Sequence, residues 1–320
     1  MWVRIVVLDG YALNPGDLSW DGLKALGDTK VYDRMPESQV VERASEANIV
    51  LTNKTPLRGE TLAKLPRLRC VSVLATGYNI VDVETAKALA IPVCNVPAYG
   101  THSVAQHTFA LILELCHRVG MHADDVRAGG WAANPDWSYS QAPLVELAGK
   151  TLGLVGYGRI AQQTARIGAA FGMNVLAYSP SRQSGGDGVA RFATLAEVVS
   201  EADFLSLHCP LTPVNQGLIN GDLLARMKRS ACLINTARGG LVVERELADA
   251  LNSGRLAGAG LDVLSTEPPA EDNPLLTATH CVVTPHNAWA TREARSRLMA
   301  ATVENVRAYL SGEPRNVVNP

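Results

Sequence analysis

Three hydrophobic segments in the second half of the chain each lead to a side chain suited to acid–base or anion chemistry. These side chains are Arg238, Glu267 (just before two prolines) and His286. If the segments are neighbouring parallel strands, their carboxyl ends open on one crevice, where α/β sheets bind ligands. An arginine fork binds carboxylates, and an imidazole exchanges protons near neutral pH. The three residues therefore predict a site where a carboxylate substrate gains or loses a proton.

Taken singly, each of these residues has an ordinary structural explanation. An arginine usually carries a solvated charge, and a glutamate before prolines usually lies at a loop tip. A histidine in a loop is more often structural than catalytic. The functional interpretation is favoured because the three residues follow a nucleotide-binding motif in the same chain.

That motif is the turn Gly156-Tyr-Gly158-Arg159-Ile160-Ala161, which follows the apolar run 151–155. The first glycine permits a tight turn, the second lets the backbone approach a pyrophosphate, and the alanine lets a helix pack on the strand. The phosphates would lie on free N–H groups of the helix that begins with Arg159 and Ile160. We expect the buried stripe of this helix to contain Ile160, Thr164, Ile167 and Phe171. The alternative is a glycine-rich turn without a ligand.

A dinucleotide motif of this kind binds NAD(H) or NADP(H). The choice between these two cofactors depends on the residue at the end of the next strand, residues 174–178. An acidic residue there usually accepts hydrogen bonds from the adenosine ribose. This chain has Ser179 instead, which cannot repel a 2′-phosphate, and Arg182 follows three residues later. We therefore expect NADP(H) to be favoured and NAD(H) to be possible. The alternative is that Arg182 is a solvated loop residue and that Ser179 tolerates either cofactor.

Strand-like runs alternate with helix-like runs, which predicts α/β layers with mostly parallel sheets. One series of strands ends near residue 95, and a second begins at residue 151. A capping box, Ser103-x-x-Gln106, is expected to start a long helix between them, and a final helix is expected over 291–310. The predicted strands are residues 3–8, 48–52, 68–73, 91–95, 151–155, 174–178, 204–207, 231–235, 258–261 and 281–284.

Composition excludes several classes of protein. The chain has 320 residues, of which 47% are hydrophobic and 19% charged, and its formal net charge is −2. This length suits two domains, and the absence of a basic excess argues against a nucleic-acid partner. No apolar run reaches the ~20 residues of a membrane-spanning helix, and the first residues lack a signal-peptide pattern. We therefore expect a cytoplasmic protein with no membrane partner.

The six cysteines are scattered and contain no C-x-x-C pair, so we expect reduced structural thiols. The pairs His102/His107 and His117/His122 are each five residues apart. Zinc-binding helices space their histidines by four residues, which places both on one face. No metal site is predicted.

Five motifs of the chain are distinctive: Leu51-Thr-Asn53-Lys54, Leu74-Ala-Thr76-Gly77-Tyr-Asn79, Leu207-His208-Cys209-Pro210-Leu-Thr, Asn235-Thr236-Ala237-Arg238-Gly and Thr284-Pro-His286-Asn-Ala-Trp-Ala-Thr. In these motifs, and across nearly its whole length, the sequence resembles the D-isomer-specific 2-hydroxyacid dehydrogenases and, within them, the bacterial glycerate dehydrogenases, also called hydroxypyruvate reductases.

The resemblance implies two Rossmann-like, doubly wound parallel-sheet domains. A nicotinamide dinucleotide domain, residues 99–287, would be inserted into a flavodoxin-like substrate-binding domain, residues 1–98 and 288–320. It also implies a homodimer built largely through the cofactor domain. The expected reaction is reduction of hydroxypyruvate or glyoxylate to D-glycerate or glycolate.

The resemblance also assigns residues to each part of the site. Arg238 would bind the substrate carboxylate, His286 would be the acid–base group, and Glu267 would hold its ring. The substrate pocket would be completed by Asn53, Lys54, Thr76 and Gly77. The further cofactor contacts would be His208, Cys209, Pro210, Thr236, Ala237 and Asp262. Asp262 would lie near the nicotinamide; the alternative is that it caps the end of its strand.

Two alternatives to this enzyme remain open. The first is a nicotinamide-sensing binding protein of the corepressor type, a branch that can keep Arg238, Glu267 and His286. The second is a sister dehydrogenase for another small acid. The chain also departs from the family pattern at Gly240, Val243 and Asn287, where proline, an acid and an aliphatic residue are common.

Overall fold

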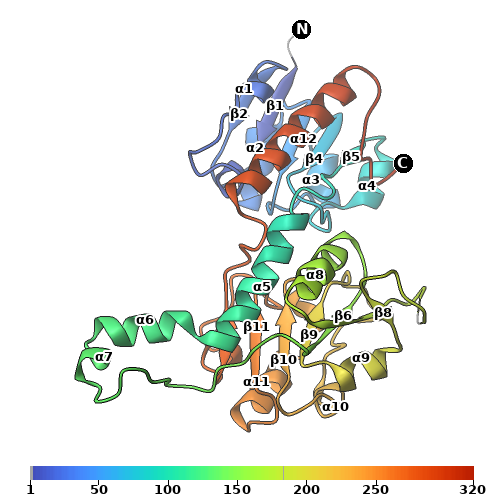
Figure 1. Ribbon diagram of the computed structural model, residues 1–320. Helices are drawn as coiled ribbons and strands as arrows, with labels where there is room; N and C mark the ends of the chain where they lie inside the picture. Colours follow the sequence, from blue (N-terminus) through green and yellow to red (C-terminus); the bar gives the residue numbers. More distant parts are fainter. Residues whose placement is uncertain (1–2, 183) are drawn as a thin grey trace. The chain divides into compact units, whose positions relative to one another are not determined.

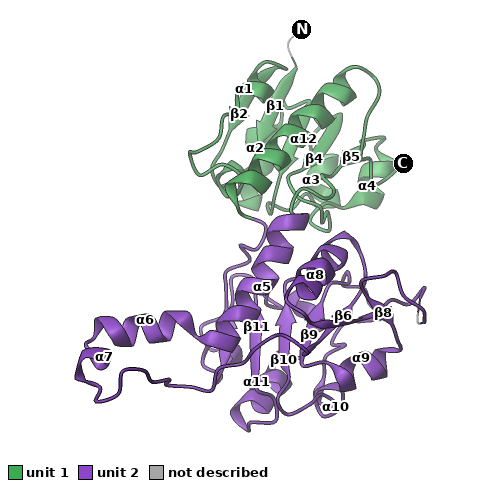
Figure 2. Ribbon diagram, in the orientation of Figure 1, with its two compact units in different colours: residues 1–100, 290–320 green, residues 101–289 purple. Residues whose placement is uncertain are grey.

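The computed structural model describes residues 3–182 and 184–320, which form two compact units (Figure 2). Unit 1 comprises Met1–Gly100 and Ala290–Pro320, and unit 2 comprises Thr101–Trp289. Unit 2 is therefore inserted into unit 1. The chain passes from one unit to the other at 100/101 and at 289/290, near the boundaries that the sequence predicts at 98/99 and 287/288.

Unit 1 contains a five-stranded parallel sheet in the order β2-β1-β3-β4-β5, the order of flavodoxin-like folds. The α/β class predicted from the sequence is confirmed. The long helix α12 packs on this sheet beside β4 (Figure 1). The elements are β1 Arg4–Val7, β2 Asp28–Val31, β3 Ile49–Thr52, β4 Cys70–Val73, β5 Val93–Cys94, α1 Asp21–Lys24, α2 Val40–Ala44, α3 Gly59–Ala63, α4 Val83–Ala88, α12 Arg292–Leu310 and the 3₁₀ turns Gly10–Ala12 and Glu37–Gln39.

Unit 2 contains a seven-stranded parallel sheet in the order β12-β11-β10-β9-β6-β7-β8. The strand order reverses between β6 and β9, which is where doubly wound sheets open a crevice for a dinucleotide. The strands are β6 Thr151–Val155, β7 Asn174–Tyr178, β8 Arg191–Phe192, β9 Phe204–Leu207, β10 Cys232–Asn235, β11 Gly258–Leu261 and β12 Cys281–Val283. The helices are α5 Thr101–His117, α6 Val119–Arg127, α7 Gly130–Ala133, α8 Arg159–Ala170, α9 Leu195–Glu201, α10 Gly221–Leu224, α11 Glu244–Asn252 and the 3₁₀ turns Gly239–Leu241 and Pro274–Leu276.

The central strands of both sheets are buried on both faces, which explains their continuous apolar sequences. All residues of β3, β4, β9, β10 and β11 are buried. Each predicted strand is present, with ends that differ by at most a few residues. The prediction missed β2 and β8, two short edge strands that contain polar, partly exposed residues.

One local prediction is wrong and another is only partly right. Helix α5 begins at Thr101, so Ser103 lies inside its first turn, and its buried hydroxyl donates to the Ala288 carbonyl at 2.6 Å instead of capping the helix. In the predicted α8 stripe, Thr164 is buried, Ile160 and Ile167 are half-buried, and Phe171 is exposed. The other buried residues of α8 are Ala161, Ala165 and Gly168. Small residues face the sheet because the helix lies close to it: a Cβ at Gly168 would meet Leu152 at 2.8 Å.

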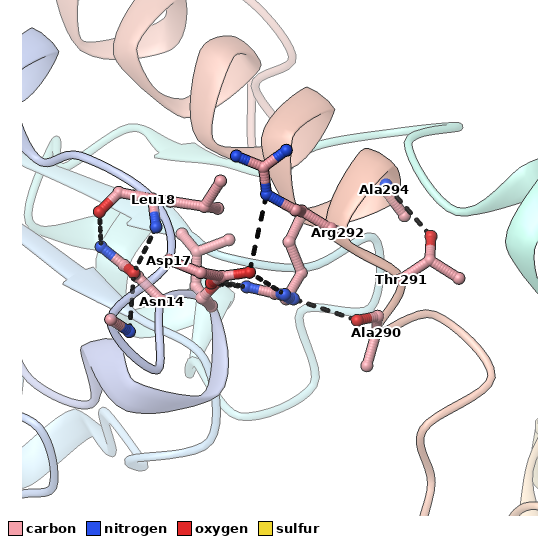
Figure 3. Close-up of polar contacts among 10 residues, drawn as sticks. Asn14, Asp17, Leu18, Ala290, Thr291, Arg292 and Ala294 are labelled. Carbon is pink, nitrogen blue, oxygen red and sulfur yellow. Dashed lines mark hydrogen bonds and ion pairs between the residues drawn. The ribbon is translucent and has the colours of Figure 1, made fainter.

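The start of α12 is fixed by an ion pair with the loop near residue 17 (Figure 3). Asp17 accepts two hydrogen bonds from the buried Arg295 guanidinium, at 2.6 and 2.7 Å. Arg295 also donates to the carbonyl of Ala290, where the chain re-enters unit 1. The Arg295 guanidinium holds the pKa of Asp17 below its ordinary value. The predicted final helix is therefore present, with Thr291 as its N-cap.

None of the helices in the described part of the chain combines the length and apolar character needed to cross a bilayer. All six cysteines are free thiols. Burial raises the pKa of the Cys232 and Cys281 thiols to about 12.

Candidate active site

His286 and Glu267 form a hydrogen-bonded pair at the carboxyl edge of the unit 2 sheet. They follow β12 and β11, which are adjacent strands. The imidazole Nδ1 lies 2.6 Å from Glu267 Oε2, and both side chains are half-buried. A carboxylate that accepts from Nδ1–H fixes the ring tautomer and stabilises an imidazolium. This arrangement leaves Nε2 for proton exchange with a substrate.

Arg238 follows β10, which pairs with β11, so its loop neighbours the one that carries Glu267. Asn235 shapes this turn: its side chain donates to the Arg238 carbonyl at 2.9 Å and accepts from the Ala237 N–H at 3.0 Å. A Cβ at Gly239 would lie 1.9 Å from the Leu264 backbone, so only glycine permits this close approach. The Arg238 side chain is exposed, as a group that binds a solute must be.

The glycine-rich turn has the geometry that a dinucleotide requires. Gly156 has φ +91°, and a Cβ there would lie 2.7 Å from the Cys209 nitrogen. A Cβ at Gly158 would meet no atom within 4 Å, so open space lies beside this backbone. Gly158 caps α8 without a side chain, which leaves the first N–H groups, including those of Arg159 and Ile160, available to phosphate oxygens. These residues fit a pyrophosphate.

The loops after β9 and β10 adjoin this turn. Burial lowers the pKa of His208 to about 4, and its Nε2 lies 2.9 Å from the Ser206 hydroxyl. His208 is therefore neutral at pH 7 and adds no charge to the predicted cofactor site. Cys209 and Pro210 follow it, and Asn215 donates to the Pro210 carbonyl at 2.8 Å. Beyond β10, the Thr236 hydroxyl lies 3.1 Å from that of Thr108 on α5, and Ala237 is half-buried.

The end of β7, where a ribose is expected, contains Ser179 and no acidic side chain. Arg182 donates its N–H to the Ser179 carbonyl, so the two residues form one tight turn. The Arg182 guanidinium lies over the Phe192 ring, 4.1 Å from its centroid, and donates to the Gly186 carbonyl. Asp187 lies in the same loop, and the Ala190 N–H and Tyr157 hydroxyl hold its pKa below the ordinary value. Arg182 therefore adjoins Ser179 through its backbone, whereas its guanidinium contacts Phe192 and the Gly186 carbonyl.

Asp262, predicted to contact nicotinamide, is only 1% exposed. Its Oδ1 accepts from the Thr284 hydroxyl at 2.6 Å and from the Asn287 N–H at 3.0 Å. Its Oδ2 accepts from the Ala288 N–H at 2.9 Å. Asp262 thus holds the loop that carries His286, and the nicotinamide contact stays a prediction.

The predicted substrate residues of unit 1 lie after β3 and β4, at the carboxyl edge of their own sheet. Asn53 is buried, and its amide donates to the Leu74 carbonyl at 2.6 Å. Its side chain therefore joins the two loops. The Thr76 hydroxyl donates to the Val96 carbonyl, and Gly77 is half-buried. Lys54 is exposed.

Two residues given no role from the sequence support loops of the candidate site, Asp9 in unit 1 and His107 in unit 2. Asp9, at the end of β1, accepts from the backbone N–H groups of Asn53, Lys54 and Thr55 at 2.5 to 2.7 Å. Its place after a buried strand could have drawn attention to it. His107 of α5 contacts Thr284 at 3.0 Å, and no local pattern points to that contact. Over residues 3–182 and 184–320, no three His, Cys, Asp or Glu side chains gather as a metal site.

Residues 109–288 match the model of the family described as D-isomer specific 2-hydroxyacid dehydrogenase, NAD binding domain. That range contains the glycine-rich turn, Arg238, Glu267 and His286.

Similarity to individual proteins covers nearly the whole chain. A hydroxypyruvate reductase of Blautia hydrogenotrophica is 51% identical over 321 residues, 99% of this chain and 100% of that protein. A glycerate dehydrogenase of Methylorubrum extorquens is 41% identical over 282 residues, 88% of each chain. A solved acyclic imino acid reductase in complex with NADPH and D-Arg has a TM-score of 0.87 and 32% identity, and the match covers 99% of this chain and 100% of that one.

Proposed function

Because the chain belongs to the family of D-isomer-specific 2-hydroxyacid dehydrogenases, we propose that it reduces hydroxypyruvate and glyoxylate to D-glycerate and glycolate. The observation that carries this proposal is the 2.6 Å pair of His286 and Glu267 in the loops next to that of Arg238. The relatives named hydroxypyruvate reductase and glycerate dehydrogenase support this choice of substrates.

In this proposal each side chain has one task. Arg238 binds the substrate carboxylate with two parallel N–H donors and polarises the adjacent keto oxygen. A bound reduced nicotinamide dinucleotide supplies the hydride that the keto carbon receives. His286 gives the Nε2 proton to the keto oxygen, and Glu267 stabilises the imidazolium before that transfer. The keto acid thus gains one hydride and one proton and becomes the 2-hydroxy acid.

The test is reduced-cofactor consumption against a panel of 2-keto acids. We expect kcat/KM to be highest for hydroxypyruvate and glyoxylate, and lower by about tenfold or more for apolar or aromatic keto acids, because one misfit group in a pocket costs ~1–3 kcal/mol. A preference of that size for pyruvate or a bulkier keto acid would indicate a sister dehydrogenase. Tight cofactor binding without turnover of any keto acid would favour a nicotinamide-sensing binding protein.

We also propose that NADP(H) is favoured over NAD(H). Ser179 places a hydroxyl, not a carboxylate, at the predicted ribose, and Arg182 is tied to the same turn by its backbone. The guanidinium uses one donor on the Gly186 carbonyl, which leaves further donors for a 2′-phosphate.

Ser179→Asp should reverse this preference. A carboxylate beside the 2′-phosphate repels it, and two unit charges near 4 Å interact by roughly 4 kcal/mol near a protein surface, so kcat/KM for NADPH should fall by about tenfold or more. The measurement is kcat/KM for NADPH and NADH, with Ser200→Asp on the exposed face of α9 as the matched control. A native preference for NADH, or unchanged NADPH use in Ser179→Asp, would show that the ribose lies elsewhere.

We further propose that the chain is a cytoplasmic homodimer assembled through unit 2. Helices α6 and α7 project from the sheet of that unit (Figure 1), and this segment exposes large apolar side chains: Val119, Val126, Trp131, Trp137 and Leu144. A second copy would cover such a surface. Light scattering should give twice the chain mass; a monomer at assay concentrations would contradict the dimer.

The cytoplasmic location is supported by the six free thiols, which fit a reducing compartment.

A further inference from the structure

A second histidine, His107, belongs to the hydrogen-bond network beneath His286. It lies on α5 and is 21% exposed, and its Nε2 is 3.0 Å from the Thr284 hydroxyl and 3.5 Å from Asp262 Oδ1. The Thr284 hydroxyl lies 2.6 Å from the same carboxylate oxygen. All three residues are in unit 2, although 177 positions separate His107 from Thr284.

The proton positions in this network follow from counting donors. Thr284 has one hydroxyl proton, and it donates that proton to the Asp262 carboxylate. Its oxygen can then only accept, so the His107 Nε2 must carry a proton. The direction is therefore from His107 to Thr284 to Asp262.

Asp262 in turn fixes the backbone that carries the catalytic histidine. Its carboxylate accepts from the N–H groups of Asn287 and Ala288, and its carbonyl accepts from the N–H of His286 at 2.8 Å. His286 has φ +50°, a conformation that a residue with a side chain adopts only at a cost and only when its surroundings hold it. Three consecutive peptide groups bonded to Asp262 provide that support.

We propose that His107 is a positioning residue: through Thr284 it holds the Asp262 carboxylate, and thereby the left-handed backbone that directs His286 toward Glu267 and the substrate. The proposal rests on His286 being the acid–base group of the proposed reaction. A buried carboxylate needs donors on both oxygens. Without the His107 donor, the Thr284 hydroxyl would turn away from the Asp262 carboxylate. The 286–288 loop, which Asp262 holds, would then relax.

The test compares four variants of the full chain. His107→Phe keeps the ring volume and removes the donor, whereas His107→Gln places an amide N–H at a similar reach. Thr284→Val removes the hydroxyl with little change in shape, and the fourth variant combines His107→Phe with Thr284→Val. Gln106→Phe, at an exposed position of the same helix, is the matched control. Each receives a Tm, a Kd for NADPH, and kcat and KM for hydroxypyruvate.

We expect kcat to fall by about tenfold or more in His107→Phe and in Thr284→Val, because small misplacements of a catalytic group cost large factors in rate. The KM for the keto acid and the Kd for NADPH should change less than about threefold. His107→Gln should recover most of kcat, and the double variant should be no slower than the slower single one. Gln106→Phe should match the native protein.

A native kcat in His107→Phe would overturn the proposal whatever the rate of Thr284→Val, and so would a native kcat in Thr284→Val or additive losses in the double variant. If His107→Phe does not fold, Thr284→Val and His107→Gln carry the test. An equal loss of kcat in these two variants would show that an amide N–H at position 107 does not restore the rate, and would overturn the proposal. A native protein that turns over no keto acid would instead refute the proposed function, because the His107 comparison requires a native rate.

Discussion

His286→Ala should lower kcat for hydroxypyruvate reduction by about 10²–10⁴-fold, the range typical for removal of a general acid. The reason is that the keto oxygen must gain a proton as the hydride arrives, and alanine has none to give. The half-buried imidazole is held by Glu267 at 2.6 Å through Nδ1, which leaves Nε2 to give the proton. The measurement is the steady-state rate, with NADPH affinity determined separately by fluorescence.

His117→Ala, at the exposed carboxyl end of α5, is the matched control and should retain the native rate. Glu267→Gln should give an intermediate loss, because an amide can still accept from Nδ1–H but does not stabilise the imidazolium by charge. A His286→Ala variant within about tenfold of the native kcat would remove His286 as the acid, since that loss lies below the usual range. A normal rate in Glu267→Gln would separate Glu267 from the chemistry.

The fold could be predicted from the sequence where burial is complete. Strands such as β6, β9 and β11 are covered on both faces, so their residues form uninterrupted apolar runs between turn residues. The edge strands β2 and β8 lack that pattern because one side of each is exposed. The α8 stripe was only partly right, because a helix packed closely on a sheet needs small residues on its buried face.

The candidate site could be predicted where a residue type suited to the chemistry lies in the turn or loop after a strand. Gly156, Arg238, Glu267 and His286 all follow strands, although Glu267 lies six residues beyond the end of β11. The supporting contacts could not be predicted, because they join distant positions. Asp9 binds backbone groups more than forty residues away. Similarly, Ser103 fits the pattern of a capping box but bonds Ala288, 185 positions later.

Arg238→Lys should lower kcat/KM for hydroxypyruvate by about 100-fold although the charge is kept. The guanidinium can bind a carboxylate through two parallel N–H donors, whereas an ammonium offers a point charge without that fork. A hydrogen bond to a charged group contributes ~1.5–3 kcal/mol, which is about ten- to 150-fold in kcat/KM. The loss should appear mainly in the KM for the keto acid, and NADPH affinity should change little.

A substrate that lacks the carboxylate isolates this contact. Glycolaldehyde retains the carbonyl and hydroxyl groups of hydroxypyruvate but has no carboxylate, so it cannot use the arginine fork. The ratio of kcat/KM for hydroxypyruvate to that for glycolaldehyde should therefore fall by about tenfold or more in Arg238→Lys. Arg229→Lys, an exposed substitution in the loop before β10, should leave the ratio unchanged. If the ratio in Arg238→Lys equals the native one, the exposed Arg238 side chain does not bind the carboxylate, and its loop serves only to shape the turn against Leu264.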